Sequence, residues 1–129
     1  IDCIVTDHAP HTVEDKEVEY DHAPFGIIGL ETSVALTIRE LVEPKFLSWT
    51  QMAEKMSAAP ARIVGLKNKG AIGEGKDADI TIIDPDKEWV FTKDDIASKS
   101  KNTPFIGRKL KGTVEYTIYS GKIVYQDSK

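Results

Sequence analysis

The sequence predicts an α/β protein, in which helices pack against a sheet and a small β module follows. Three observations predict this class. A short β-branched apolar run covers residues 1–6, an apolar period typical of a helix covers residues 30–42, and Gly and Asp separate short β runs after residue 66. The 129 residues suit one average domain or pieces of two. We therefore expect a division into residues 1–66 and residues 67–129.

Composition and charge exclude several classes of protein. The chain is 40% hydrophobic and 29% charged, which indicates a globular protein rather than a disordered one. Its net charge of −4 makes nucleic acid and acidic membrane surfaces unexpected partners. The apolar runs are too short to span a bilayer, and we expect no signal peptide. The single Cys3 excludes an internal disulfide and favours a reducing, cytoplasmic location.

Residues 1–6 are expected to form a strand that is buried on both faces. Chains rarely begin inside a buried strand, because termini usually lie at the surface. Ile1 begins directly in strand-like sequence, without an initiator methionine. We therefore expect this chain to be the C-terminal piece of a longer protein.

An acidic loop without an apolar period is expected at residues 7–25. Loops of this length are usually functional or mobile, and we hypothesise that residues 12–24 move. The alternative interpretation is a solvated acidic excursion without a function.

Helices are expected between this loop and residue 66. The first covers residues 30–42, where apolar residues recur at helical spacing. A second follows an N-cap at Ser48 or Thr50, and a separate short helix covers residues 60–64. We expect these helices to cover one face of a sheet.

The second half is expected to be a small β module. Asp-Pro-Asp at residues 84–86 predicts a turn between two strands, and Ser120 with Gly121 predicts a tight hairpin. The expected strands are residues 78–83, 88–92, 113–119 and 122–125.

The chemistry-bearing residues concentrate at residues 6–11, which read TDHAPH. An aspartate at the C-terminal end of a strand can be a metal ligand, a general base or both, but Asp7 can equally start a turn or cap a helix. His8 and His11 could add ligands to Asp7, although residues this close together rarely complete a metal site. His11 and His22 can also be ordinary polar loop residues, and for His22 this interpretation is favoured.

Residues 6–11 and residues 24–32 (PFGIIGLET) together resemble the bacterial class of dihydroorotases within the amidohydrolase superfamily. Later segments agree with this resemblance. Residues 73–80 (GEGKDADI) resemble the start of the superfamily's small β domain, and residues 102–105 (NTPF) with residues 117–125 (TIYSGKIVY) look like the C-terminus of the family. The resemblance implies the C-terminal part of a (β/α)8 TIM-type barrel, followed by a small β-sandwich-like domain.

The resemblance also implies roles for individual residues. Asp7 corresponds to the last metal ligand of the barrel and to the general base, in an active site that holds two Zn²⁺ ions. His11 matches a position near the substrate carboxylate, and Phe25 with Gly26 matches a segment whose backbone contacts the pyrimidine ring. The implied reaction is the reversible cyclisation of N-carbamoyl-L-aspartate to L-dihydroorotate in pyrimidine biosynthesis. His8 matches no ligand.

The chain departs from the family pattern in the remaining metal ligands. The family's His-x-His pair, bridging acidic residue and two further histidines have no counterparts in this sequence, nor do the arginine and asparagines that hold the substrate. We therefore predict that the isolated chain is inactive. The expected partner is the remainder of the same protein or a second chain that completes the barrel, with a homodimer or a transcarbamoylase complex as further partners.

Other functions are compatible with the same residues. Another cyclic amidohydrolase, of the dihydropyrimidinase or allantoinase type, would share most of the pattern, but a neutral ring would gain nothing from His11. A non-catalytic amidohydrolase-like subunit could bind a transcarbamoylase. A self-contained α+β binding module is the third alternative, and the strand-like residues 1–6 argue against it.

Overall fold

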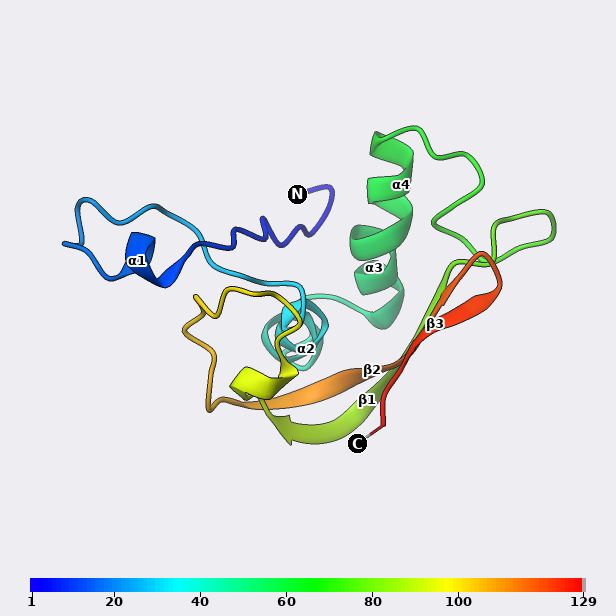
Figure 1. Cartoon of the computed structure of the whole chain (residues 1–129). Helices are drawn as coiled ribbons and strands as arrows, with labels where there is room; N and C mark the ends of the chain where they lie inside the picture. The colour runs from blue at the N-terminus through cyan, green and yellow to red at the C-terminus, as the bar shows by residue number, and fades with distance from the viewer. Residues whose placement is uncertain (129) are drawn as a thin grey trace.

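The chain combines helices with one antiparallel sheet (Figure 1), as described for residues 1–128 by a computed structural model. The sheet has the strand order β1-β2-β3, with β1 at Ile80–Val90, β2 at Lys109–Tyr119 and β3 at Lys122–Gln126. The mixture of helices and strands agrees with the predicted class. Residues 1–128 form this one sheet, however, and not the two facing sheets of a sandwich.

Two helical stretches lie above the sheet in the view of Figure 1. Their segments are α2 (Ser33–Thr37) with the π-helical turn η1 (Ile38–Val42), and α3 (Trp49–Ala53) with the π-helical turn η2 (Glu54–Ala58) and α4 (Ala59–Ile63). The expected separation of a second and a third helix is wrong, because α3, η2 and α4 are continuous. Ser48 is the N-cap, and its hydroxyl accepts the Gln51 N–H at 3.2 Å. No helix within residues 1–128 is long and apolar enough to cross a membrane.

Pro60 accounts for the π-helical turn in this continuous helix. Proline has no N–H and its ring crowds the preceding turn, so the regular hydrogen-bond pattern cannot continue through it. The Ala59 N–H instead bonds the Glu54 carbonyl, five residues back. The Lys55 carbonyl accepts the backbone N–H of Ile4 at 2.9 Å. A proline in the helix thus provides an attachment point for the N-terminal segment.

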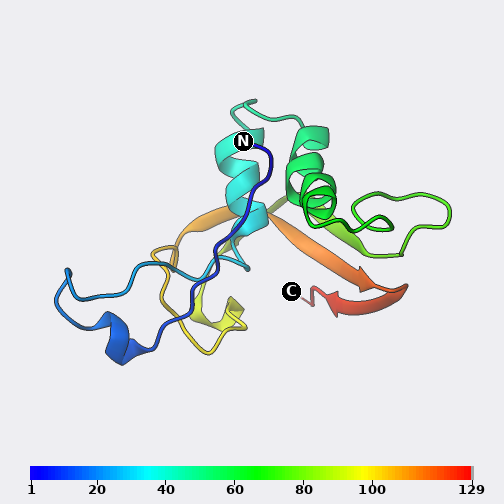
Figure 2. The same cartoon turned by 90° about the horizontal axis from the view of Figure 1, so that it is seen from above.

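Residues 1–6 are extended but pair with no other strand among the described residues. Val5 is 72% exposed, so the expected burial on both faces is not met within residues 1–128. A strand-like pattern reports backbone preference and apolar content, whereas burial also needs neighbouring elements. Figure 2 shows this segment crossing α2 and leading to a loop that projects from the rest of the molecule and carries the short helix α1 (Val13–Lys16).

Strand β1 is longer than either strand expected from the sequence. Residues 84–86 do form a turn, because the Asp84 Oδ1 accepts the N–H groups of Asp86 at 2.9 Å and Lys87 at 3.2 Å. The turn is an irregularity inside β1, however, and the chain returns to its partner β2 at Glu88. The two expected strands are therefore one interrupted strand.

The predicted hairpin between β2 and β3 is confirmed. Ser120 and Gly121 have φ values of 49° and 76°, which suit a two-residue turn between antiparallel strands. The Asp79 carboxylate accepts the Ser120 N–H at 2.8 Å and also pairs with Lys69. The Lys69 hydrogen bond and the Ser120 N–H together hold the pKa of Asp79 below its usual value.

Two apolar clusters join the helices to the sheet. One consists of Ile28, Ala35, Phe91, Ile96 and Leu110, and the other of Ile38, Val42 and Met52 with the half-buried Ile83 against it. Each cluster combines residues from both sides of the expected boundary at residue 66. The division into two parts stays a prediction.

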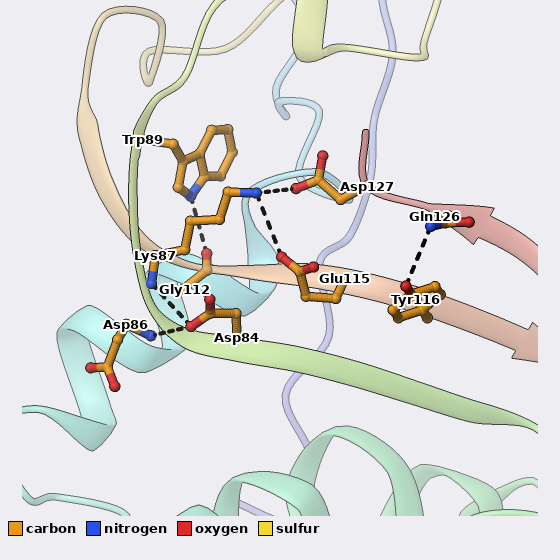
Figure 3. Close-up of polar contacts among 9 residues, drawn as sticks. All are labelled: Asp84, Asp86, Lys87, Trp89, Gly112, Glu115, Tyr116, Gln126 and Asp127. Atoms are coloured by element: carbon orange, nitrogen blue, oxygen red, sulfur yellow. Dashed lines mark hydrogen bonds and ion pairs between the residues drawn. The ribbon is translucent and has the colours of Figure 1, made fainter. Parts of the chain in front are cut away.

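Polar contacts reinforce the end of the sheet near the last residues of the chain (Figure 3). The Lys87 Nζ lies 2.8 Å from an Asp127 carboxylate oxygen and 3.5 Å from one of Glu115. These carboxylates, Asp127 above all, raise the pKa of Lys87. The Trp89 indole N–H donates to the Gly112 carbonyl at 3.1 Å, so β1 and β2 are also joined through a side chain.

Candidate active site

The predicted site residues gather where residues 6–11 run beside residues 25–29. The backbone N–H of Ala9 donates to the carbonyl of Ile27 at 2.9 Å. The sequence indicates each segment separately, and the fold brings them together across the loop that carries α1.

Two glycines permit this close approach. Gly26 has a φ of 100°, and a Cβ built on it would lie 2.5 Å from the Cβ of Ala9. A Cβ on Gly29 would lie 3.3 Å from both the Cβ and the carbonyl oxygen of Thr6. A side chain at either position would push residues 6–11 and residues 25–29 apart, which explains the glycine at both positions.

Asp7 occupies an exposed position with an unusual backbone. Its φ of 44° lies in the left-handed region, which Asp tolerates better than most residues. Within residues 1–128, no hydrogen bond or ion pair joins its carboxylate to another side chain or to the backbone. The carboxylate is therefore available to a metal ion or to a reacting proton.

His11 is fixed at both its backbone and its ring. The Nε2 atom lies 2.9 Å from the Phe25 carbonyl oxygen, and because a carbonyl only accepts, Nε2 carries the hydrogen. The backbone N–H donates to the Asn102 Oδ1 at 3.3 Å. The predicted substrate-binding residues His11, Phe25 and Gly26 thus lie together. Phe25 is 94% exposed, and its carbonyl oxygen is the group that bonds His11.

His8 connects the two segments instead of pointing to a ligand. Its Nδ1 accepts the backbone N–H of Gly29 at 3.2 Å, so in the neutral ring the hydrogen is on Nε2. This contact gives His8, for which the resemblance implied no ligand role, a structural part next to Asp7.

Asp7, His8 and His11 do not form a complete metal site. Among residues 1–128, the group of three possible ligands whose atoms converge within 4.8 Å is Glu19, Asp21 and His22, all exposed in the projecting loop. Both His8 and His11 use a ring nitrogen to bind backbone groups. The chemistry of Asp7 suits a single carboxylate ligand, and the described residues around it do not complete a metal site.

Sequence reasoning missed two residues that hold the site segments. The Asn102 Nδ2 donates to the Ala9 carbonyl at 2.9 Å and to the Gly26 carbonyl at 3.4 Å. The Lys16 Nζ donates to the carbonyls of Pro24 at 2.6 Å and Gly26 at 2.8 Å. Asn102 belongs to the NTPF segment that helped to indicate the family, but neither this segment nor a Lys in an acidic loop indicates a role in the site. Both roles depend on contacts that only the folded chain makes.

Comparison with known proteins identifies the class. The family model described as "Amidohydrolase family" matches residues 2–124, so the chain belongs to the amidohydrolase family. Within it, the chain is similar to dihydroorotases, with 53% identity to that of Endomicrobium trichonymphae and 54% to that of Pelotomaculum thermopropionicum. Each alignment covers 98% of this chain and 30% of the relative. The resemblance expected from the sequence is confirmed, and the chain spans about 30% of the length of these relatives.

This chain also matches solved structures over nearly its whole length, and it again covers a similar share of theirs. L-hydantoinase (dihydropyrimidinase) from Arthrobacter aurescens matches with a TM-score of 0.91 and 32% identity, over 100% of this chain and 30% of that chain. D-hydantoinase (dihydropyrimidinase) from Thermus sp. matches with a TM-score of 0.88 and 26% identity, over 100% of this chain and 29% of that chain. The arrangement of helices and sheet described above therefore recurs as one portion of these longer hydantoinase chains.

Proposed function

We propose that this chain forms part of a zinc-dependent dihydroorotase, which interconverts N-carbamoyl-L-aspartate and L-dihydroorotate. The observation that carries the proposal is identity of about one half to dihydroorotases across almost the whole chain. The exposed Asp7 carboxylate and the adjacent His11 supply chemistry suited to this reaction. The proposal concerns the complete enzyme, of which this chain would contribute one side of the active site.

Asp7 would act as metal ligand and as general base. During ring opening, it takes a proton from the attacking water and delivers it to the amide nitrogen as the C–O bond forms and the C–N bond breaks. In the cyclisation direction, it removes the proton from the attacking carbamoyl nitrogen. Zinc, when bound, lowers the pKa of a coordinated water towards about 7, so that a carboxylate can deprotonate it.

His11, Phe25 and Gly26 would bind the substrate. The Phe25 carbonyl accepts the His11 Nε2–H, and Nδ1 faces no partner within residues 1–128. In the imidazolium form, in which both ring nitrogens carry a hydrogen, Nδ1 would donate to the substrate carboxylate. Backbone groups of Phe25 and Gly26 would contact the ring. Because Gly26 and Gly29 let residues 25–29 pack closely against residues 6–11, the backbone groups of Phe25 and Gly26 would be held in place before substrate binds.

In this proposal, residues 1–6 are the last strand of a (β/α)8 barrel. The exposed Val5 would then be covered by strands from the remainder of the protein or from a second chain. The further metal ligands, including those of a second zinc ion, would come from the same source. The proposal divides this chain into residues 1–66, which belong to the barrel, and residues 67–129, which belong to the small β domain.

The test is Asp7→Asn in the complete enzyme that contains this chain. We expect turnover to fall by roughly 10²–10⁴-fold, the usual contribution of a general base, while thermal stability is retained. Asp21→Asn, which changes an exposed carboxylate in the projecting loop, is the matched control and should leave turnover unchanged. Wild-type turnover in Asp7→Asn would refute the role of Asp7. The isolated 129-residue chain should show no turnover at any zinc concentration, and robust activity would contradict the need for further ligands.

A dihydropyrimidinase-type activity is the second candidate, because hydantoinases share this arrangement at TM-scores up to 0.91. The lower sequence identity of 32% to the Arthrobacter enzyme, against 53% to a dihydroorotase, makes it the weaker candidate. His11→Ala separates the two. It should weaken the binding of dihydroorotate, which carries a carboxylate, and have little effect on a neutral dihydropyrimidine. Preferred turnover of the neutral ring by the wild-type enzyme would favour the second candidate.

A further inference from the structure

Asn102 is the residue that joins the two site segments to the β region of the chain. It lies between the short 3₁₀ helix η3 (Lys93–Asp95) and β2, 91 residues after His11. Its side chain contacts Ala9, His11 and Gly26, and its backbone carbonyl accepts the N–H of Ile28 at 3.1 Å. One residue thereby bonds to both segments of the candidate active site.

Both ends of the Asn102 amide are used. The Oδ1 accepts the backbone N–H of His11 at 3.3 Å, while the Nδ2 donates to the carbonyls of Ala9 at 2.9 Å and Gly26 at 3.4 Å. Carboxamides are the short side chains that offer a planar acceptor and two donors on one group. Aspartate has the same size but no donor in its ionised form, and it would face the Ala9 and Gly26 carbonyls with a negative charge.

The contacts of Asn102 end on groups that the proposed function assigns to substrate binding. His11 is held at its backbone by Asn102 and at its ring by the Phe25 carbonyl. The Gly26 carbonyl is held by Asn102 and also by the Lys16 Nζ at 2.8 Å. The orientations of the His11 ring and of the peptide after Gly26 are therefore coupled through Asn102. Asp7 has no contact with Asn102 among the described interactions.

We propose that Asn102 is a positioning residue, which sets the geometry of His11 and of the Phe25–Gly26 backbone for the substrate. This inference rests on the proposed function for its kinetic consequence, but the coupling of the segments stands on the contacts alone. Because Asn102 acts on substrate-binding groups and not on Asp7, its loss raises KM and leaves kcat close to its original value.

The kinetic test compares Asn102→Ala and Asn102→Asp with Lys99→Ala in the complete enzyme. Lys99 is exposed in the same segment and has no described polar contact, so Lys99→Ala is the matched control. We expect KM for dihydroorotate to rise about tenfold in both Asn102 variants, with kcat within about threefold of wild type. Asn102→Asp distinguishes hydrogen bonding from space filling, because it keeps the size of the side chain and loses the donors.

Hydrogen exchange gives a readout that needs no activity. We expect the peptides that contain residues 9–11 and 26–28 to exchange faster in both Asn102 variants, while the peptide of β2 is unchanged. If wild type has no dihydroorotase turnover, the proposed function fails, and the exchange result still decides whether Asn102 holds the segments. If Asn102→Ala does not fold, Asn102→Asp decides alone.

Three results would overturn the inference. Unchanged exchange at both segments would show that Asn102 does not hold them. Unchanged KM would show that holding them does not serve substrate binding. Faster hydrogen exchange in the β2 peptide, together with a proportional loss of turnover, would show that Asn102 stabilises the fold in general and does not position the site.

Discussion

Residues 1–27 and the sheet with its covering helices are held by different kinds of contact. The sheet region is stabilised by two apolar clusters that contain buried residues such as Phe91 and Ile38. The N-terminal region is held mainly by hydrogen bonds to backbone groups, from Lys55, Asn102 and its own loop. The comparison shows that the candidate site is positioned by the sheet and helices, whose apolar clusters supply the stability, as is common for functional loops.

The largest expected difference concerns two phenylalanines. Phe91 is 1% exposed in the first apolar cluster, whereas the Phe25 side chain is exposed in the site. We expect Phe91→Ala to lower the free energy of unfolding by about 3–5 kcal/mol. Phe25→Ala, the matched control, should change it by less than about 0.5 kcal/mol. Urea denaturation followed by circular dichroism measures both, and equal losses would break the comparison.

Gly112 offers a test within the sheet. A Cβ there would lie 2.4 Å from the Cδ1 of the buried Ile38, and the residue has a φ of 86°. Gly112→Ala should therefore cost about 1–3 kcal/mol for the clash in addition to the backbone strain. Gly75→Ala is the control for strain alone, since its φ is 77° and its Cβ would meet no atom within 4 Å. A cost no larger than that of Gly75→Ala would show that η1 does not press on β2.

Asp79 allows a test by pH. Its contacts with Lys69 and the Ser120 N–H lower the pKa of the folded carboxyl below the usual value of about 3.8. A lowered pKa stabilises the fold above that value, and this contribution is lost as the pH falls through the folded pKa. Asp79→Asn should therefore have a lower Tm than wild type at pH 7, and the gap should shrink below about pH 4. A gap that is constant with pH would contradict the role of the charge, and the exposed Asp21→Asn should show no gap.

The smallest effect is expected for Val5→Ala in this chain. Because the side chain is exposed, the free energy of unfolding should change by less than about 0.5 kcal/mol. In the complete protein, burial of the same residue in a barrel would raise the cost towards about 1.5–3 kcal/mol. An equally small effect in both would argue against residues 1–6 being a barrel strand.

Local patterns predicted many elements well. The helical period led to the helix that ends at Val42, and Ser48 proved to be a cap because its hydroxyl reaches the N–H three residues on. The hairpin at Ser120 and Gly121 followed from local backbone preference. These features involve neighbours within a few residues, so short patterns contain the information that they need.

Errors occurred where a local signal has more than one structural outcome. Pro60 was expected to begin a new helix, but the chain absorbs it in a π-helical turn within a continuous one. The turn at Asp84 was expected to separate two strands, but β2 pairs with the chain on both sides of it. Neither pattern specifies what the flanking residues contact, and those contacts decide the outcome.

The same distinction applies to the candidate site. Short consecutive motifs sufficed to draw attention to Asp7 and to indicate the family. The roles of His11, Phe25 and Gly26 came from the resemblance to dihydroorotases, and they stay predictions. Residues 6–11 lie beside residues 25–29 only in the folded chain. The same holds for the hydrogen bond between His8 and Gly29 and for the hydrogen bonds of the Asn102 side chain. Asn102 contacts a residue 91 positions away, and such a contact exists only after the sheet and helices have brought both segments together.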